Sequence, residues 1–340
     1  MTSKERVLTA LHGNVPDRVP VVEFVIDENV ARRAAPGCMD VADCMDRIGM
    51  DGVGCGASFA TVRENADGSY IDEWGVTYLP CAEQVAHPLA GPVQSRDDAE
   101  SYIPPDPHAD GRLGVLADLV RRYGRDKAIV FHHRAAFMWS AYLMGLDNLL
   151  MNMLAEPDMV DVLMDKVLET NIAIVQRAIR TGADIIVLGD DYAHNRGPMM
   201  SPELFRRFIL PRLRRMIEAI HAEGALCIKH SDGNLYPILD DIVGAGPDGI
   251  NPIEPVAGME LQEVKRRVGD RVCLSGNIDC ARLLPYGSEE DVRAAVRQAI
   301  ADAADGGGFI LSSSNSIHSG CRPENLVAMV KACREFGAYH

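Results

Sequence analysis

The sequence lacks the long apolar runs of a membrane protein and the basic surplus of a nucleic-acid-binding protein. No uncharged apolar run reaches the roughly 18 residues of a membrane span, and the first residues lead into an amphipathic segment instead of a signal-peptide core. The chain has 34 lysines and arginines against 49 aspartates and glutamates, a net charge of −15. This balance disfavours binding to nucleic-acid phosphates or anionic lipid. We expect a cytoplasmic protein with a small-molecule substrate.

Cysteine pairs with redox or metal-binding spacing are also lacking. The nine cysteines are scattered, odd in number and contain no Cys-x-x-Cys pair, unlike the disulfide framework of a secreted protein. We expect most of them to be reduced and buried. A Walker loop, a Gly-x-Ser-x-Gly elbow and a convincing dinucleotide-binding loop are absent as well, which disfavours nucleotide and serine-hydrolase chemistry.

Short apolar runs alternate with segments of helical periodicity along most of the 340 residues. This alternation is typical of a parallel sheet with crossover helices. Eight such units predict a (β/α)₈ TIM barrel that forms a single domain over residues 1–340. A doubly wound open sheet is the alternative. The eight predicted strands are Val19–Phe24, Gly52–Cys55, Ala128–Phe131, Asp184–Leu188, Leu226–Lys229, Gly249–Ile253, Val272–Leu274 and Phe309–Leu311.

The segment after the second predicted strand does not fit the barrel pattern. Thr61–Leu79 alternates around the turn residues 65–68, which predicts a β-hairpin, and a proline-rich loop follows. We therefore predict a hairpin and loop insertion at about residues 57–112. Trp74 lies in this hairpin, where it could close over an aromatic substrate or form part of the insertion's own core.

Reactive side chains follow most of the predicted strands. In a barrel, the carboxyl ends of the strands carry the active site. His230 and Asp232 are two residues apart, so in an extended strand they share a face, and Cys321 follows the last strand. An imidazole, a carboxylate and a thiolate can bind zinc and leave a fourth position open. Alternatively, His230 and Asp232 bond to each other and Cys321 is a small loop residue.

Two other strand ends carry paired polar residues. Asp190 and Asp191 could divide acid and base roles or supply a metal ligand, or one of them could cap a helix or turn. His132 and His133 are neighbours in a strand, so they point to opposite faces and only one is expected in a cavity. We favour His133.

Several motifs together resemble the uroporphyrinogen decarboxylase-like superfamily over nearly the whole chain. They are Pro16-Asp17-Arg18-Val19-Pro20, Asp72-Glu73-Trp74-Gly75, Lys229-His230-Ser231-Asp232-Gly233-Asn234, Gly276-Asn277-Ile278-Asp279, Ser314-Asn315-Ser316-Ile317-His318 and Pro323-Glu324-Asn325. The resemblance implies a barrel. It does not choose among functions, because this fold hosts several.

The resemblance points more to the corrinoid-dependent methyltransferase branch than to the true decarboxylases. The decarboxylases have an arginine-rich N-terminal segment that grips substrate carboxylates, whereas this chain has Pro20-Val21-Val22-Glu23-Phe24-Val25. Coenzyme M members of the methyltransferase branch bind zinc through a His-x-Cys pair and a distant Gly-Cys loop. His230 and Cys321 match the outer ligands, and Asp232 replaces the middle cysteine.

These observations predict a methyltransferase that passes a methyl group from a small donor, such as an aryl methyl ether, to the cobalt of a separate corrinoid protein. The resemblance supplies the acceptor and zinc, and the oligomeric state stays open, with a homodimer as one option. The predicted metal ligands are His230, Asp232 and Cys321, the catalytic residues are Asp191, Asp232 and Glu254, and the substrate-binding residues are Glu23, His133, Asp190, Asn277 and His318.

Two rival functions stay open. A metal-free decarboxylase-like lyase would use Asp191 or Asp232 as proton donor and would bind a small carboxylate through basic residues, for which Arg134 and Arg196 are the candidates. A non-catalytic binding subunit with the same cavity is the third hypothesis.

Overall fold

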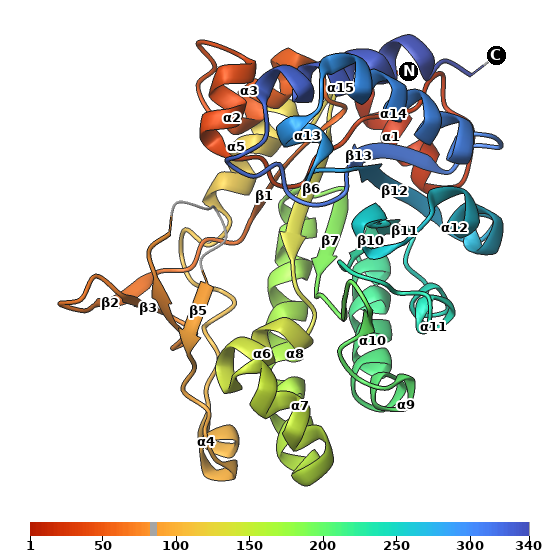
Figure 1. The fold of residues 1–340 in the computed structure, drawn as a ribbon. Helices are drawn as coiled ribbons and strands as arrows, with labels where there is room; N and C mark the ends of the chain where they lie inside the picture. Colours follow the sequence, from red (N-terminus) through yellow and green to blue (C-terminus); the bar gives the residue numbers. More distant parts are fainter. Residues whose placement is uncertain (82–86, 340) are drawn as a thin grey trace.

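The computed structural model describes residues 1–81 and 87–339. Its centre is a curled seven-stranded parallel sheet in the order β1-β6-β7-β10-β11-β12-β13 (Figure 1). These strands are β1 (Gly52–Gly56), β6 (Ala128–His133), β7 (Ile185–Gly189), β10 (Leu226–His230), β11 (Gly249–Asn251), β12 (Cys273–Ile278) and β13 (Phe309–Ser313). The order follows the chain and neighbouring strands are parallel, as in a TIM-like barrel. The predicted α/β class with a parallel sheet is confirmed.

The first predicted strand is wrong. Within the described residues, Val19–Phe24 contributes one isolated bridge, between Val21 and Leu311, and no strand. Pro20 lacks the N–H that a ladder needs, although its carbonyl accepts from Leu311 N at 2.9 Å. On the other side, Asp51 N donates to the Val21 carbonyl at 2.8 Å. The segment therefore links β13 to the start of β1 without being a strand itself.

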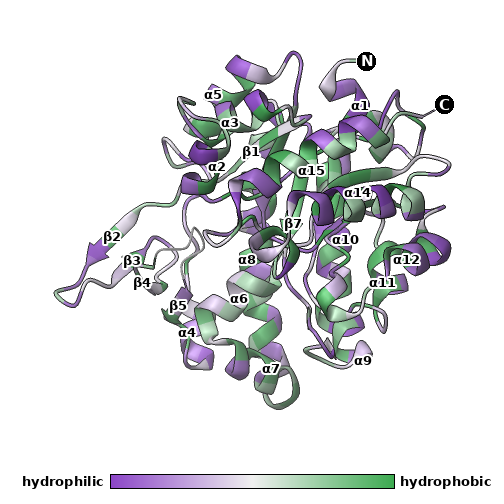
Figure 2. Cartoon of the chain, turned by 45° about the horizontal axis from the view of Figure 1, so that its top comes forward, coloured by the Kyte–Doolittle hydropathy of each residue, from purple (hydrophilic) through white to green (hydrophobic). Residues whose placement is uncertain are grey.

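Fifteen helices are found among the described residues, and several of them pack against the sheet. They are α1 (Ser3–Leu11), α2 (Glu28–Ala34), α3 (Val41–Ile48), α4 (Arg96–Ser101), α5 (Gly114–Tyr123), α6 (Phe137–Met144), α7 (Leu146–Ala155), α8 (Pro157–Thr181), α9 (Pro202–Leu204), α10 (Leu210–Ala222), α11 (Leu239–Val243), α12 (Leu261–Val268), α13 (Leu283–Tyr286), α14 (Glu289–Ala303) and α15 (Pro323–Phe336). A π-helical turn (Phe205–Ile209) joins α9 to α10, and a 3₁₀ turn spans Pro255–Ala257. In α14, the buried residues Val292, Val296, Ala299 and Ala303 recur at helical spacing. Figure 2 shows the same alternation of hydrophilic and hydrophobic residues along α12 and α14.

A second, antiparallel sheet lies to the left of the parallel sheet in Figure 1. It contains β2 (Thr61–Glu64), β3 (Tyr70–Asp72), β4 (Thr77–Leu79) and β5 (His87–Ala90), in that order. The predicted hairpin falls on the first three of these strands. Its description as an insertion into a barrel stays a prediction. The short strands β8 (Ala193–His194) and β9 (Gly197–Pro198) pair with each other.

The cysteines differ from expectation at one pair. Cys38 and Cys44 are joined by a disulfide, whereas Cys227, Cys273 and Cys280 are buried as predicted. Among the helices that the structure describes, none combines the length and apolar character that crossing a membrane requires.

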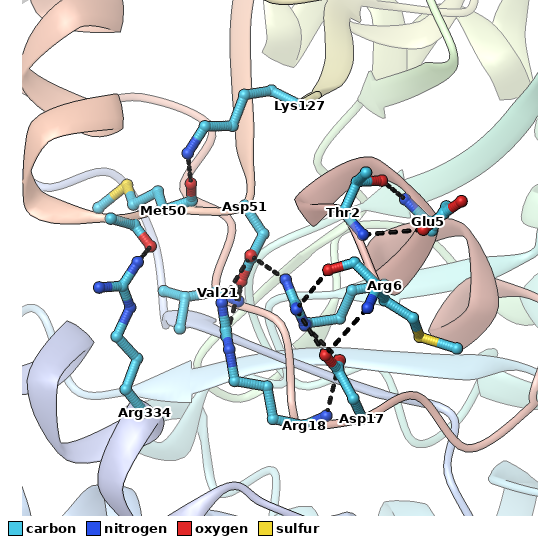
Figure 3. A network of polar contacts seen from close by, with 12 residues as sticks. Thr2, Glu5, Arg6, Asp17, Arg18, Val21, Met50, Asp51, Lys127 and Arg334 are labelled. Carbon is cyan, nitrogen blue, oxygen red and sulfur yellow. Dashed lines mark hydrogen bonds and ion pairs between the residues drawn. The ribbon is translucent and has the colours of Figure 1, made fainter. Parts of the chain in front are cut away.

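A network of ion pairs lies at the amino ends of β1 and β6 (Figure 3). Asp51, which precedes β1, accepts from Arg6 Nη1 at 2.8 Å, from Arg18 Nη2 at 2.8 Å and from Val21 N at 2.9 Å. Arg6 also bonds Asp17 at 2.6 Å, and this guanidinium lowers the pKa of Asp17 to about 2. The buried charges at this end of the sheet therefore have opposite charges as neighbours.

Candidate functional site

A cavity of about 1130 Å³ lies at the carboxyl ends of the parallel strands. Residues at the ends of β6, β7, β10, β11 and β13 form one part of its wall, and residues of β2 to β5 and α6 form another. A second cavity, of about 700 Å³, lies beside the starts of α14 and α15. The larger cavity is the candidate active site because it holds most of the predicted acid and imidazole residues.

Three of these residues meet at the ends of β7 and β10. One ligand atom each of Asp191, His230 and Asp232 lies within 4.8 Å of the others. His230 Nε2 is 3.7 Å from Asp191 Oδ1 and 3.4 Å from Asp232 Oδ1. The prediction that His230 and Asp232 share a face is confirmed. Asp191 joins them because β7 and β10 are parallel neighbours in the sheet.

The other nitrogen of His230 defines its proton arrangement. Its Nδ1 lies 2.6 Å from Asn251 Oδ1. The amide nitrogen of Asn251 is already used as donor, to the Ser275 carbonyl at 3.2 Å and to Ser312 Oγ at 3.1 Å. Asn251 Oδ1 is therefore an acceptor, Nδ1 of His230 carries a hydrogen, and in the neutral imidazole Nε2 presents its lone pair to the two carboxylates.

Asp232 is held in place on one side only. Asn315 Nδ2 donates to Asp232 Oδ2 at 2.6 Å, whereas Oδ1 is buried without a hydrogen-bond partner among the described residues. Burial raises the pKa of Asp232 above its usual range. His230 acts against this shift, and the neighbouring carboxylates of Asp191 and Glu254 add to it. The structure therefore brings together negative charge that a cation would stabilise.

These residues fit a divalent metal ion with nitrogen and oxygen ligands. Zinc accepts histidine nitrogen and carboxylate oxygen, and three protein ligands with an open position are typical of catalytic sites. Metal-binding histidines usually donate their other N–H to a carbonyl or carboxylate, as His230 does to Asn251. Two of the three predicted ligands, His230 and Asp232, lie in this group, and Asp191 is its third member.

The structure does not bring Cys321 into this group. Cys321 is buried, its sulfur lies 3.8 Å from the Cys280 carbonyl, and it lines the smaller cavity. His318, from the same loop, lines the larger cavity and bonds the Cys280 carbonyl through Nε2 at 3.0 Å. Because the loop after β13 has no regular periodicity, the direction of the cysteine could not be predicted from the sequence.

Glu23 lines the cavity and is fully buried. Its carboxyl group lies 2.6 Å from Ser313 N and 2.7 Å from Ser313 Oγ, and burial raises its pKa to about 8. Ser313 Oγ also contacts the Asn315 carbonyl. A hydroxyl has one hydrogen, so a protonated Glu23 that donates to Ser313 leaves that hydrogen for the carbonyl. Glu23 is thus connected to Asp232 through Ser313 and Asn315.

Both histidines of β6 line the cavity, although only one was expected there. His133 Nε2 bonds Asn171 at 3.0 Å, whereas His132 Nε2 is buried without a partner among the described residues. Burial lowers the pKa of His132 to about 4 and that of His133 to about 3, so both rings are neutral. A Cβ atom at Gly54 would lie 2.9 Å from His132 Nε2, so the glycine in β1 provides space for this ring.

Besides Cys321, three predicted site residues are not among the described residues that line the cavity: Asp190, Glu254 and Asn277. Asp190 is buried and accepts from Ala135 N, Ala136 N and Met138 N at 3.0–3.1 Å. It therefore caps the start of α6, which was the alternative interpretation for one member of the aspartate pair. Glu254 accepts from Gly233 N at 2.8 Å and so fixes the loop that follows Asp232.

Lys229 supports the same strand ends from the opposite face of β10. It is buried, and its ammonium group donates to the Asp190 carbonyl at 2.6 Å, to the Leu188 carbonyl at 3.2 Å and to the His230 carbonyl. The ammonium also lies 4.2 Å from the centre of the Tyr192 ring. Burial lowers the pKa of Lys229 to about 8. Its contacts fix the backbone that carries Asp191 and His230.

The sequence prediction missed Asn251, and it named His133 alone where both histidines of the pair line the cavity. Asn251 ends β11, so the rule that strand ends carry the site could have selected it. A single amide at a strand end, however, is a weak signal. His132 has no distinguishing sequence feature, because its unpartnered nitrogen depends on Gly54 in the neighbouring strand.

Comparisons with known proteins agree with this architecture. A family model described as uroporphyrinogen decarboxylase (URO-D) matches residues 80–336. Uroporphyrinogen decarboxylase from Aeromonas salmonicida is 24% identical over 270 residues, which cover 73% of this chain and 71% of that protein. The corresponding enzyme from Thioalkalivibrio sulfidiphilus is 30% identical over 166 residues, 47% of this chain and 44% of that one. A solved methyltransferase from Methanosarcina mazei has a TM-score of 0.81 at 21% identity and covers 99% of both chains, a likeness of fold.

Proposed function

The chain belongs to the uroporphyrinogen decarboxylase family, and we propose that within it this protein is a methyltransferase. It takes the methyl group of a small donor, such as an aryl methyl ether, and passes it to the reduced cobalt of a separate corrinoid protein. The observation that carries the proposal is the group of Asp191, His230 and Asp232 inside a large cavity. The fold shared with a methyltransferase supports the reaction class. The motif resemblance supplies the corrinoid acceptor.

The proposed reaction breaks the bond between the methyl carbon and the ether oxygen. The electron pair of that bond stays on oxygen, and the two electrons of the reduced cobalt form the new bond to carbon. The departing oxygen then needs a proton or a positive charge. A metal ion such as zinc, held by Asp191, His230 and Asp232, would polarise this oxygen as a Lewis acid.

The chain's own residues supply the remaining functions. Asn251 orients His230 so that Nε2 faces the carboxylates, and Asn315 holds Asp232. With Asp191 assigned to the metal group, Glu23 is the proton donor, because its raised pKa of about 8 leaves it protonated at neutral pH. His132 and His133 are neutral and do not repel a cation at the metal group.

The test is methyl transfer with purified components. The protein is mixed with a corrinoid protein in its reduced cobalt state and a panel of methoxylated aromatics and methylamines, and cobalt methylation is followed by its absorption spectrum. We expect methylation with at least one donor and its loss in His230→Ala. The matched control is His221→Ala, because His221 pairs with Asp248 outside the cavity. No methylation with any donor, or full activity in His230→Ala, would reject the proposal.

A second experiment separates the two ligand sets. Metal content is measured after chelation and reconstitution with zinc for Asp191→Asn and Cys321→Ser. The geometry predicts that Asp191→Asn loses the metal and that Cys321→Ser retains it, whereas the sequence-based set predicts the reverse. Equal retention of one zinc by both variants and by His230→Ala would place the metal elsewhere.

The rival lyase is less consistent with the charges of the cavity. Arg134 is the one lysine or arginine among the described residues that line it, and Arg196 is exposed and outside it. The lining includes the carboxyl groups of Glu23, Asp27, Asp72, Asp191 and Asp232. A substrate with several carboxylates would find one guanidinium among the described lining residues to bind them. Carbon dioxide release without cobalt methylation would identify a lyase, and binding without either reaction would identify a binding subunit.

A further inference from the structure

Arg134 is a cation in the cavity wall with unused hydrogen-bonding capacity. It follows β6, and its one hydrogen bond within the described residues runs from Nη2 to Tyr142 Oη at 3.4 Å. Its Nε is buried without a partner, and Arg134 takes part in none of the ion pairs found among the described residues. A guanidinium has five N–H donors in a planar fork that matches a carboxylate. Most of these donors are therefore left for a ligand.

Aromatic rings surround this guanidinium. Its central carbon lies 5.8 Å from the centre of the Trp139 ring and 5.4 Å from that of Tyr142. Phe59 packs edge-on against Trp139 with ring centres 5.4 Å apart, and Trp74 stacks on Trp139 at 4.3 Å. Phe59, Trp139 and Tyr142 line the cavity. Such a wall favours a flat aromatic ligand, through stacked and edge-to-face contacts.

The two parts of the cavity therefore differ in charge. Asp191 and Asp232 follow β7 and β10, whereas Arg134 follows β6 and contacts rings of α6. The carboxyl group of Asp72 also lines the cavity, and it accepts hydrogen bonds from Trp74 N and Val76 N at 3.0 Å. An anionic substituent would be repelled by the carboxylates and attracted by the guanidinium. A ligand that fits both groups of residues has an aromatic ring with a carboxylate that binds the guanidinium and, on the opposite side, a neutral polar group that faces Asp191 and Asp232.

We propose that Arg134 binds the carboxylate of the substrate, so that the methyl donor is a methoxy-substituted aromatic acid. The ring packs against Phe59, Trp139 and Tyr142, and the methoxy group points toward Asp191, His230 and Asp232. The identity of the methyl donor rests on the proposed function. The recognition of an aromatic carboxylate by Arg134 does not, because it can be measured by binding alone.

The test compares 4-methoxybenzoate with its neutral analogue 4-methoxybenzamide by titration calorimetry on the whole chain. Fluorescence gives an independent readout, because the chain has only two tryptophans, of which Trp139 lines the cavity and Trp74 stacks on it. We expect the acid to bind about 10- to 100-fold more tightly than the amide. Arg134→Gln should remove this preference and leave the affinity for the amide within about twofold. Arg134→Lys should restore part of it, which a purely structural role would not predict.

Arg196→Gln is the matched control, since Arg196 is exposed and does not line the cavity. Equal affinity for acid and amide in the wild type, unchanged preference in Arg134→Gln, or no saturable binding of the acid below about 10 mM would each overturn the proposal. If circular dichroism shows that Arg134→Gln is unfolded, the affinities of Arg134→Lys and the acid-to-amide affinity ratio of the wild type test the proposal instead.

The binding experiment and the methyl-transfer experiment can each reject one proposal without rejecting the other. Arg134-dependent binding of the acid without cobalt methylation would retain the carboxylate site and reject the methyltransferase function. Methylation from neutral aryl ethers at the same rate as from the acids would retain the function and reject the carboxylate site.

Discussion

The two ends of the parallel sheet differ in whether their buried polar groups have hydrogen-bond partners. At the amino ends, Asp51 has no exposed surface, and both of its oxygens accept hydrogen bonds from Arg6, Arg18 or Val21 N (Figure 3). At the carboxyl ends, Asp232 Oδ1 and His132 Nε2 are buried without a partner among the described residues. Buried polar atoms are nearly always satisfied in stable proteins. The comparison indicates that the polar groups at the amino ends stabilise the fold and that those at the carboxyl ends are available to bind a ligand.

Backbone strain is found at the carboxyl ends as well. Ile253 has a φ of 57°, a left-handed conformation that is unfavourable for a β-branched residue. It lies between Asn251, which orients His230, and Glu254, which fixes the loop after Asp232. Such strain persists where the surrounding structure enforces it and is common near functional sites.

The largest expected effect tests the amino ends. Asp51→Ala would leave the guanidinium groups of Arg6 and Arg18 buried without their shared partner. We expect the free energy of unfolding to fall by about 3–5 kcal/mol, measured by urea denaturation. Metal and ligand binding by the folded fraction should not change. A loss below about 1 kcal/mol would show that this network does not stabilise the fold.

The next effect tests the buried acid of the carboxyl ends through its pH dependence. The pKa of Glu23 is about 8 in the folded protein, above its ordinary value of 4.5. The folded state therefore holds this proton more tightly than the unfolded state does. The resulting stability is fully present below pH 4.5 and is lost as the pH rises to about 8, by on the order of 4 kcal/mol.

Glu23→Gln isolates this contribution, because it keeps the shape of the side chain and does not titrate. The unfolding free energy of the variant minus that of the wild type, measured by urea denaturation between pH 4.5 and 8, should increase with pH, because only the wild type loses stability. A difference that stays constant across this range would mean that Glu23 does not carry a raised pKa.

A smaller effect of opposite sign is expected at Asp232. Its charged form is disfavoured by burial and by the nearby carboxylates. Asp232→Asn keeps the bond from Asn315 and removes the charge, so the metal-free protein should gain about 1 kcal/mol in unfolding free energy at pH 7. The same variant should lose bound metal. Lower stability together with retained metal would contradict the contrast between the two ends.

The smallest expected effect is at an exposed ion pair, and it serves as a reference for the effect of removing a buried one. Arg32 and Glu28 lie one helical turn apart on α2 and are 47% and 58% exposed. Glu28→Gln should change the unfolding free energy by less than about 0.5 kcal/mol. A change as large as that of Asp51→Ala would mean that charge number, and not burial, explains the amino-end result.

The predicted strands were located well where the chain has apolar runs bounded by polar residues. Seven of the eight became neighbours in one sheet, and the alternation of strands and helices was sufficient to indicate this order. The failure at Val19–Phe24 has a local cause, because Pro20 cannot donate a hydrogen bond. Its role in linking β13 to the start of β1 depends on two contacts that are distant in sequence.

The direct contacts within the candidate site were predicted only where residues are close in sequence. His230 and Asp232 share a face because a strand repeats every two residues. Asp190 and Asp191 are adjacent, yet one caps α6 and the other faces His230. No local pattern distinguishes them, because the difference depends on the position of α6.

The sequence by itself therefore determined the class of fold, the order of its strands and the pairing of an imidazole with a carboxylate at one strand end. These features follow from hydrophobic periodicity, which acts over a few residues. The tertiary structure alone decided that Asp191 and not Cys321 completes the group and that Arg134 is surrounded by aromatic rings. Such choices depend on packing between distant segments, and the spacing of residues along the chain carries no information about them.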